Sequence, residues 1–167
     1  CTLVDAIKAV NTDTVSGCCD PGDGADIIEL QTDVVLTVPF YNNHGTPPVT
    51  SDITIMGNGH TISRDPTAAD WFRIFSVYPG GDLTLKNVTV SGGRSAASGG
   101  AVDVTMGTLH VIDSTITGNH ANNSGGGIFN TSGHVAISGS TFYDNSAGYN
   151  GGGLVLYGHG STGEIES

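Results

Sequence analysis

Apolar and polar side chains alternate in short runs along most of the chain, and these runs return at a fixed interval. The interval is 26 residues, and it separates two sets of equivalent positions: Leu83, Leu109 and Val135, and Gly100, Gly126 and Gly152. A repeat of this length indicates a stacked array, because one unit cannot bury its apolar face without its neighbours. We therefore expect a solenoid.

Each repeat contains three short segments with the period of two that is typical of strands. Leu83 and Leu85 flank Thr84, residues 88–90 repeat this alternation, and a third segment at 101–104 follows a pair of glycines. Three such strands with their turns fill about 26 residues, one turn (rung) of a parallel β-helix. The pattern predicts an all-β, right-handed parallel β-helix. A leucine-rich horseshoe is disfavoured because each unit lacks a helical segment.

The two ends of the chain differ from the repeats. Leu3, Ala6, Ile7 and Val10 have helical spacing, so we predict that residues 1–25 form an N-terminal cap with a short amphipathic helix and a loop rich in Cys, Asp and Gly. Residues 26–167 then form about five rungs, the last of them incomplete. The last rung has no polar cap, and we predict an assembly surface there, made by Leu154, Leu156 and Ile165.

Charge and composition limit the classes of molecule that we expect the chain to bind. The 167 residues include 16 Asp and Glu but only five Lys and Arg, and the formal net charge is −11. Nucleic acid is an unsuitable partner, because binding to it relies on cationic side chains. No run approaches the roughly 18 apolar residues that a membrane span needs. A second copy of the chain, a host or cell-surface protein, or a glycan remains as the expected partner.

Three cysteines lie near the N-terminus, outside the repeats. We expect one disulfide, from Cys1 to either Cys18 or Cys19, which predicts an oxidising compartment. A zinc site is disfavoured, because adjacent cysteines lack the spacing that lets two sulfurs converge on one metal. The chain is thus expected to be extracellular or on a cell surface.

Two sequence phrases carry a family resemblance. Residues 1–7, Cys-Thr-Leu-Val-Asp-Ala-Ile, resemble the Cys-Ser-Leu-Arg-Glu-Ala phrase (the CSLREA domain) that precedes β-helical regions in secreted bacterial and archaeal proteins. Val4 and Asp5 depart from that phrase. The motifs at 99–102, 126–128, 152–154 and 142–145 are similar to the Gly-Gly-Ala-Ile and Phe-x-x-Asn repeats of polymorphic outer-membrane adhesins. The resemblance implies a secreted or surface β-helix with adhesive or structural roles and no catalytic residue.

Several polar positions have structural explanations. Asn119 and Asn145 lie one interval apart, so we predict that their amides bond along the axis as a ladder, and that Gly126 and Gly152 allow close approach at a corner. Three Asn-x-Ser/Thr motifs are candidate sites of N-linked glycosylation. They begin at Asn87, Asn122 and Asn130.

The spacing of acidic residues and histidines in the sequence gives less support to a catalytic site or a metal site. Glycoside hydrolysis needs carboxylates together on one face, and we expect no column of equivalent positions to gather acids. His110 and His134 are not one interval apart, so the spacing does not require them to converge. The acidic N-terminal loop is a weak calcium candidate, because its spacing matches no standard calcium loop, and a solvated loop is the favoured interpretation. Its candidate ligands are Asp13, Asp20, Asp23 and Asp26.

The sequence thus favours a non-catalytic extracellular β-helix with a structural or adhesive role, which assembles head to tail into filaments through its uncapped C-terminal end. Two other classes stay open. One is a polysaccharide-active enzyme, a lyase or a hydrolase. The other is a carbohydrate-binding module with Trp71, Tyr78 or Tyr149 as a stacking platform, although we expect Trp71 to be buried.

Overall fold

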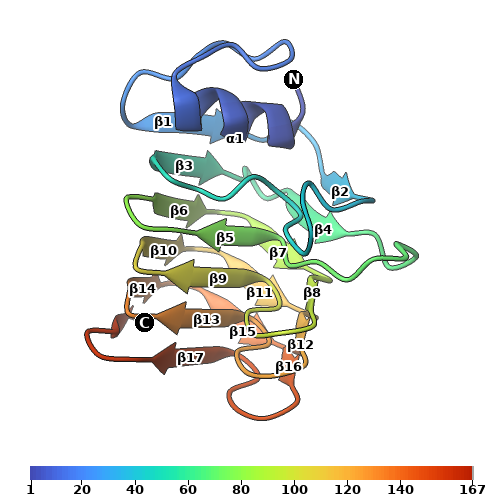
Figure 1. The fold of residues 1–167 in the computed structure, drawn as a ribbon, viewed down its shortest axis with the longest axis vertical. Helices are drawn as coiled ribbons and strands as arrows, with labels where there is room; N and C mark the ends of the chain where they lie inside the picture. The colour runs from blue at the N-terminus through green and yellow to red at the C-terminus, as the bar shows by residue number, and fades with distance from the viewer. Residues whose placement is uncertain (167) are drawn as a thin grey trace.

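The computed structural model describes residues 1–166 and shows a parallel β-helix of about five turns with one short α-helix at its N-terminal end. The strands stack as parallel arrows in Figure 1, and the chain descends from α1 toward the C-terminus without reversing. The predicted fold class is confirmed.

Four parallel sheets form the walls. The six-stranded sheet has the order β1 (Asp26–Glu29), β3 (Asp52–Met56), β6 (Asp82–Lys86), β10 (Thr108–Ile112), β14 (His134–Ser138) and β18 (Thr162–Glu166). The five-stranded sheet has the order β15 (Thr141–Tyr143), β11 (Thr115–Thr117), β7 (Thr89–Ser91), β4 (Thr61–Arg64) and β2 (Val34–Leu36). The four-stranded sheet has the order β17 (Leu154–Tyr157), β13 (Ile128–Thr131), β9 (Val102–Thr105) and β5 (Phe75–Val77).

A three-stranded sheet, which the alternation did not predict, makes the remaining wall. It consists of β16 (Ser146–Ala147), β12 (His120–Ala121) and β8 (Arg94–Ser95). Each of these strands has two residues, which is too short to show a period of two in the sequence. The three rungs from β6 to β17 therefore have four strands each, one more than predicted, whereas the rung of β3, β4 and β5 has the three strands that the pattern predicts.

Residues one interval apart stack directly on each other. Leu83 pairs with Leu109, and Leu109 pairs with Val135. The earlier rungs keep the same register although their loops differ in length, since Thr61 pairs with Thr89. The loops at the corners absorb the extra residues, and the sheets remain aligned.

The inward positions form one continuous apolar core. Ile53, Leu83 and Leu109 are fully buried in successive strands of the six-stranded sheet, and Ile62 and Val90 face them from the five-stranded sheet. Each such side chain contributes about 1.5–3 kcal/mol by leaving water. The outward positions between them carry Thr, Ser, Asp and His, as the alternation predicts.

The N-terminal end is closed by α1 (Leu3–Thr12). Thr2 caps the helix, since its Oγ1 accepts a hydrogen bond from the Asp5 backbone N–H at 3.1 Å, and Asp13 ends it in the left-handed conformation. The helix buries Leu3, Ile7 and Val10 against the first rung. The structure also pairs Cys1 with Cys19, with a Cα–Cα distance of 5.2 Å, and leaves Cys18 as an exposed thiol.

Candidate functional site

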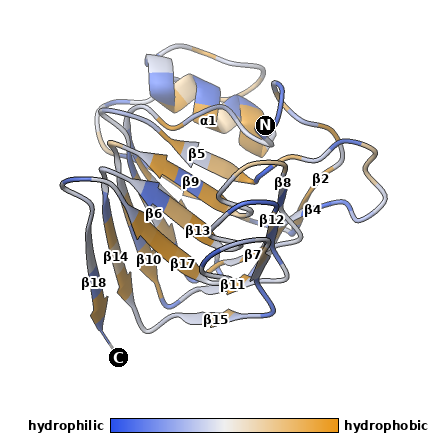
Figure 2. Cartoon of the chain, turned by 60° about the horizontal axis from the view of Figure 1, so that its bottom comes forward, coloured by the Kyte–Doolittle hydropathy of each residue, from blue (hydrophilic) through white to orange (hydrophobic). Residues whose placement is uncertain are grey.

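The open C-terminal rung, formed by β15, β17 and β18, is one of the regions where the structure leaves apolar side chains in water; Val15, Ile27 and Val38 near the N-terminal end are also exposed. Figure 2 turns this end toward the viewer. Leu156 is 42% exposed and Ile165 is 74% exposed, whereas Val111 and Ile137, which precede Ile165 in the same column, are 0% and 6% exposed. Leu154 and Phe142 are only partly buried against the core. The predicted assembly residues therefore all lie at this end.

A hollow of about 250 Å³ opens between these side chains. Its lining is almost entirely apolar and consists of Ile137, Ser140, Phe142, Gly153, Leu154 and Ile165. Gly163 occupies the inward position below Val135, and Leu156 lies where a side chain on Gly163 would project. Leu156 thus occupies the space beside Gly163, and the hollow lies instead between Phe142 and Ile165, where no further rung within residues 1–166 covers it.

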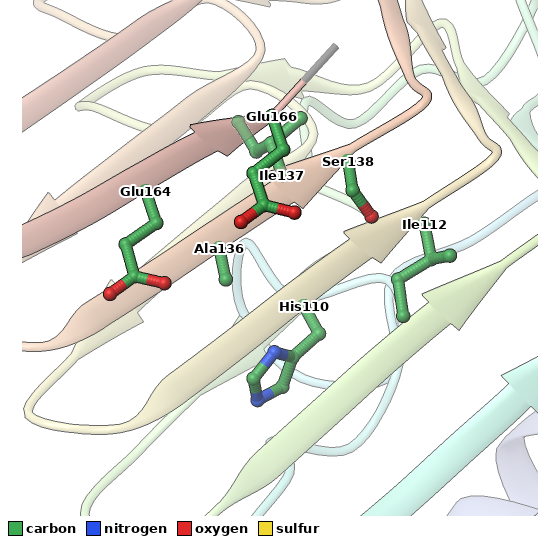
Figure 3. A pocket seen from close by; sticks show the side chains of 7 residues that line it. All are labelled: His110, Ile112, Ala136, Ile137, Ser138, Glu164 and Glu166. Carbon is green, nitrogen blue, oxygen red and sulfur yellow. The ribbon is translucent and has the colours of Figure 1, made fainter.

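The outer face of the same rung carries a second, polar hollow of about 130 Å³ (Figure 3). It arises because Ala136 lies between the larger His110 and Glu164 in one outward column. The carboxylates of Glu164 and Glu166 and the imidazole of His110 all project from this face of the sheet (Figure 3). Residues two apart on a strand lie on the same face of a sheet, so Glu164 and Glu166 place two carboxylates beside one hollow.

Imidazole and carboxylate groups continue from this hollow along the outer face. His110 Nε2 lies 3.5 Å from Asp82 Oδ1, and the rings of His110 and His134 pack with centroids 6.2 Å apart. His134 Nδ1 lies 2.6 Å from the hydroxyl of Thr162. The interval between the two histidines did not reveal this contact, because they pack diagonally across neighbouring strands and not within one column.

Two acids share a column on this face, which corrects the expectation that no column gathers acids. Asp52 pairs with Asp82 on the adjacent strand. Burial raises the pKa of Asp82 above its ordinary 3.8, Asp52 adds to this effect, and His110 opposes it. The pair escaped the sequence pattern because the loop between β4 and β6 makes the step between these two rungs longer than the later interval.

The asparagine ladder lies inside the solenoid. Asn119 Nδ2 donates to Asn145 Oδ1 at 3.0 Å and to the Val90 carbonyl at 3.2 Å, while Asn119 Oδ1 accepts from the Gly93 N–H at 2.9 Å. Asn119 is fully buried, so these bonds satisfy backbone groups that water cannot reach.

The corner glycines lie where two backbones come close. A Cβ on Gly126 would collide with the carbonyl of Ser146, and one on Gly152 would collide with the carbonyl of Asn145. The positive φ values belong to the preceding residues, Gly125 and Gly151. The glycines thus serve the packing of the rungs.

The three glycosylation candidates differ in exposure. Asn87 and Asn122 are exposed, but Asn130 is fully buried and its amide bonds both the N–H and the carbonyl of Gly133, at 3.0 and 2.8 Å. The folded chain has no room for a glycan on Asn130, so that candidate was wrong. Its column already signalled this, because Asn130 replaces the buried Val104 one interval later.

The acidic N-terminal loop shows no ready metal site. Asp26 Oδ1 accepts a hydrogen bond from the Asp23 N–H at 3.0 Å, Asp13 caps α1, and Asp20 is exposed. Within residues 1–166, no three His, Cys, Asp or Glu side chains are arranged to hold a metal ion. Calcium binding stays a prediction for this loop.

Trp71 is exposed, contrary to the expectation that it is buried. Its exposed fraction is 40%, the Arg94 guanidinium lies 5.3 Å from its ring, and the His120 ring meets it edge-on at 5.8 Å. Of the other two predicted platforms, Tyr149 is 79% exposed, and Tyr78 packs edge-on against His44.

A buried polar cluster holds the loop that precedes β3. His44 Nδ1 lies 2.7 Å from the hydroxyl of Ser76, and the nearby Arg73 guanidinium donates to Asp103 Oδ2 at 2.9 Å. Burial lowers the pKa of His44, and Arg73 lowers it further. Burial raises the pKa of Asp103 although Arg73 opposes this effect. Ser76 is fully buried, so its contact with His44 pins the loop and does not activate an accessible nucleophile.

The part of the chain that the structure describes contains no helix with the length and apolar character of a membrane span. Comparison with protein-family models, with curated proteins and with solved structures gives no match to this chain.

Proposed function

We propose that the chain is a non-catalytic, extracellular structural or adhesive β-helix that assembles with further copies through its open C-terminal rung. The observation that carries the proposal is the exposure of Leu156 and Ile165 beside an apolar hollow at the end of an otherwise filled core.

Two physical effects favour the addition of β-structure at this end. The outer edges of β15, β17 and β18 have no strand beside them within residues 1–166, so their free N–H and carbonyl groups can pair with a further strand. Covering Leu154, Leu156 and Ile165 would also remove apolar surface from water, at about 25 cal/mol per Å². Both effects act along the solenoid axis.

The opposite end sets a condition on the assembly. Because α1 covers the first rung, a head-to-tail stack requires the open C-terminal rung of one copy to pack on the outer side of α1 in the next. Such a contact is heterologous and repeats into a filament. The extracellular location is supported by the Cys1–Cys19 disulfide.

Sedimentation velocity over a range of concentrations, with electron microscopy of the same samples, tests the proposal. The unmodified chain is expected to assemble as concentration rises. The double variant Leu154→Glu with Ile165→Glu should stay monomeric, because it places two charges at the open C-terminal rung. Met106→Glu is the matched control, since Met106 is 59% exposed on a corner away from this end. A monomer at every concentration would overturn the proposal.

The polar hollow of Figure 3 supports a second candidate, a polysaccharide-active enzyme. Inverting glycosidases use two carboxyl groups on opposite sides of the scissile bond, and Glu164 and Glu166 both line this hollow from the same face of β18. Release of reducing ends from polysaccharides, lost in both Glu164→Gln and Glu166→Gln, would establish this activity. Assembly without sugar release would exclude it for the substrates used.

A further inference from the structure

The structure separates the three glycosylation motifs into two usable sites and one unusable site. We infer that Asn87 and Asn122 are acceptors for N-linked glycan, and that Asn130 is not. This inference rests on the extracellular location that is part of the proposed function. In the reaction, Asn Nδ2 bonds to the anomeric carbon of a lipid-pyrophosphate-linked oligosaccharide, loses a proton, and the lipid pyrophosphate leaves.

Asn87 projects from a corner of the solenoid. It lies between β6 and β7 with a φ of 49°, a left-handed conformation that Asn tolerates well. The residue is exposed, and within residues 1–166 its side-chain amide makes no hydrogen bond. Thr89, which completes the motif, begins β7 with its side chain on the outward side. A glycan on Nδ2 therefore extends into solvent without displacing a protein contact.

Asn122 lies on another corner, directly after β12. It is exposed, and its Oδ1 lies 3.3 Å from His120 Nε2. When His120 Nε2 donates that hydrogen bond to Asn122 Oδ1, Asn122 Nδ2 has no hydrogen-bond partner within residues 1–166. Ser124, which completes this motif, forms a bridge to Asn150 on the next rung through its backbone, so its hydroxyl is not needed for the ladder.

Asn130 is not exposed, and its side-chain nitrogen is not free of hydrogen bonds. Its side chain points into the core, and its amide satisfies the N–H and the carbonyl of Gly133, which turns the chain between β13 and β14. A glycan on Nδ2 would need space that the buried core around Asn130 does not offer, so it would force the rung apart and expose the paired groups of Gly133, at a cost of several kcal/mol. Chains that carry a glycan there cannot complete the fold.

The two accessible sites have a common consequence for the proposed assembly. Asn87 and Asn122 lie on lateral corners, between the six- and five-stranded sheets and between the three- and four-stranded sheets. Neither lies on β15, β17 or β18. Glycans at these corners would hinder side-to-side contact between solenoids and leave the open C-terminal rung free, which favours axial assembly.

Secretion of the chain from yeast, followed by peptide mass mapping of the folded, disulfide-bonded protein, tests the inference. Enzymatic removal of glycans in oxygen-labelled water converts each glycosylated Asn to labelled Asp. We expect label at positions 87 and 122 and none at position 130. Asn87→Gln and Asn122→Gln should each lose one of the two glycans, and Ser132→Ala, which abolishes the third motif and spares Asn130, should lose none.

Variants that keep both asparagines and change only the third residue of a motif show whether a glycan is lost because the motif is broken or because the chain misfolds. Thr89→Ala and Ser124→Ala should each abolish one glycan, and Thr89→Ser should retain it. Absence of glycan from Asn87 or Asn122, or its presence on Asn130 in folded protein, would overturn the inference. The sedimentation experiment reports separately on assembly, so glycosylated monomers would contradict the proposed function alone, and unglycosylated filaments would contradict the inference alone.

Discussion

The two ends of the solenoid face the same physical problem and differ in how it is met. At the N-terminal end, α1 places Leu3, Ile7 and Val10 over the first rung, and the Cys1–Cys19 bond ties the following loop to the start of the helix. At the C-terminal end, Leu156 and Ile165 remain exposed, and an apolar hollow opens beside Ile165. The comparison teaches that apolar side chains at an end of the stack are buried where a helix covers them and exposed where residues 1–166 provide no cover.

Truncation of one isoleucine at each end should give the largest difference in the free energy of unfolding between two matched variants. Ile7→Ala removes a fully buried side chain from the cap, so we expect it to lower the free energy of unfolding by about 2–5 kcal/mol. Ile165→Ala trims a side chain that is 74% exposed, and its effect should be below about 0.5 kcal/mol. Urea denaturation followed by circular dichroism measures both. Equal losses would contradict the contrast between the ends.

Loss of the disulfide should weaken the closed end further. Cys1 and Cys19 are separated by 18 residues, and freeing a loop of this length costs about 3 kcal/mol. Cys1→Ser should lower the melting temperature measured by calorimetry without reductant, whereas Cys18→Ser should leave it unchanged. A loss in Cys18→Ser as large as that in Cys1→Ser would show that Cys18 is the real partner.

The asparagine ladder contains one asparagine that is fully buried and one that is only partly buried near the open C-terminal rung. Asn119→Ala leaves the Gly93 N–H and the Val90 carbonyl unpaired in the core, which should cost about 2–3 kcal/mol. Asn145 lies in the last complete rung and is only partly buried. Water can replace part of its bonding, so Asn145→Ala should cost about 1 kcal/mol. Guanidinium unfolding of the two variants measures the difference, and the reverse order would show that the open end is covered.

The smallest expected effect lies midway between the ends, where Asp52 and Asp82 pair. Because the pKa of Asp82 is raised in the fold, its charged form is disfavoured there, and stability is lost as the pH rises from 3.8 through the raised value. Asp82→Asn should therefore stabilise the chain at neutral pH, by less than about 1 kcal/mol since the side chain is partly solvated. Below pH 3.8 the gain should vanish. Melting curves at several pH values measure it, and a loss at neutral pH would contradict the prediction.

The regular rungs were predictable because their spacing records which residues stack. Leu109 and Val135 repeat Leu83 at the same interval, and the structure places all three in register. The contacts that were not predicted join residues that are not separated by 26 residues in the sequence. Asp52 and Asp82 are separated by a longer loop, and the two histidines of the outer face meet diagonally.

The choice between Cys18 and Cys19 also could not follow from spacing, since both are equally near Cys1 in the sequence and only the packing of the loop distinguishes them. The exposure of Trp71 depends on the path of the long loop before β5, which has no counterpart in the other rungs. The burial of Asn130, in contrast, follows from its column, because Val104 occupies the equivalent inward position. That signal was present in the sequence and was overlooked.

The position of α1 also bears on how the chain acquires its structure. In a solenoid each rung contacts only its neighbours, so folding can begin at any sufficiently stable rung and spread to the rungs beside it. The helix and its disulfide stand immediately before the first rung. The cap adds buried contacts and a covalent tie to the first rung, so we expect this end to be a favoured nucleus from which order spreads from turn to turn.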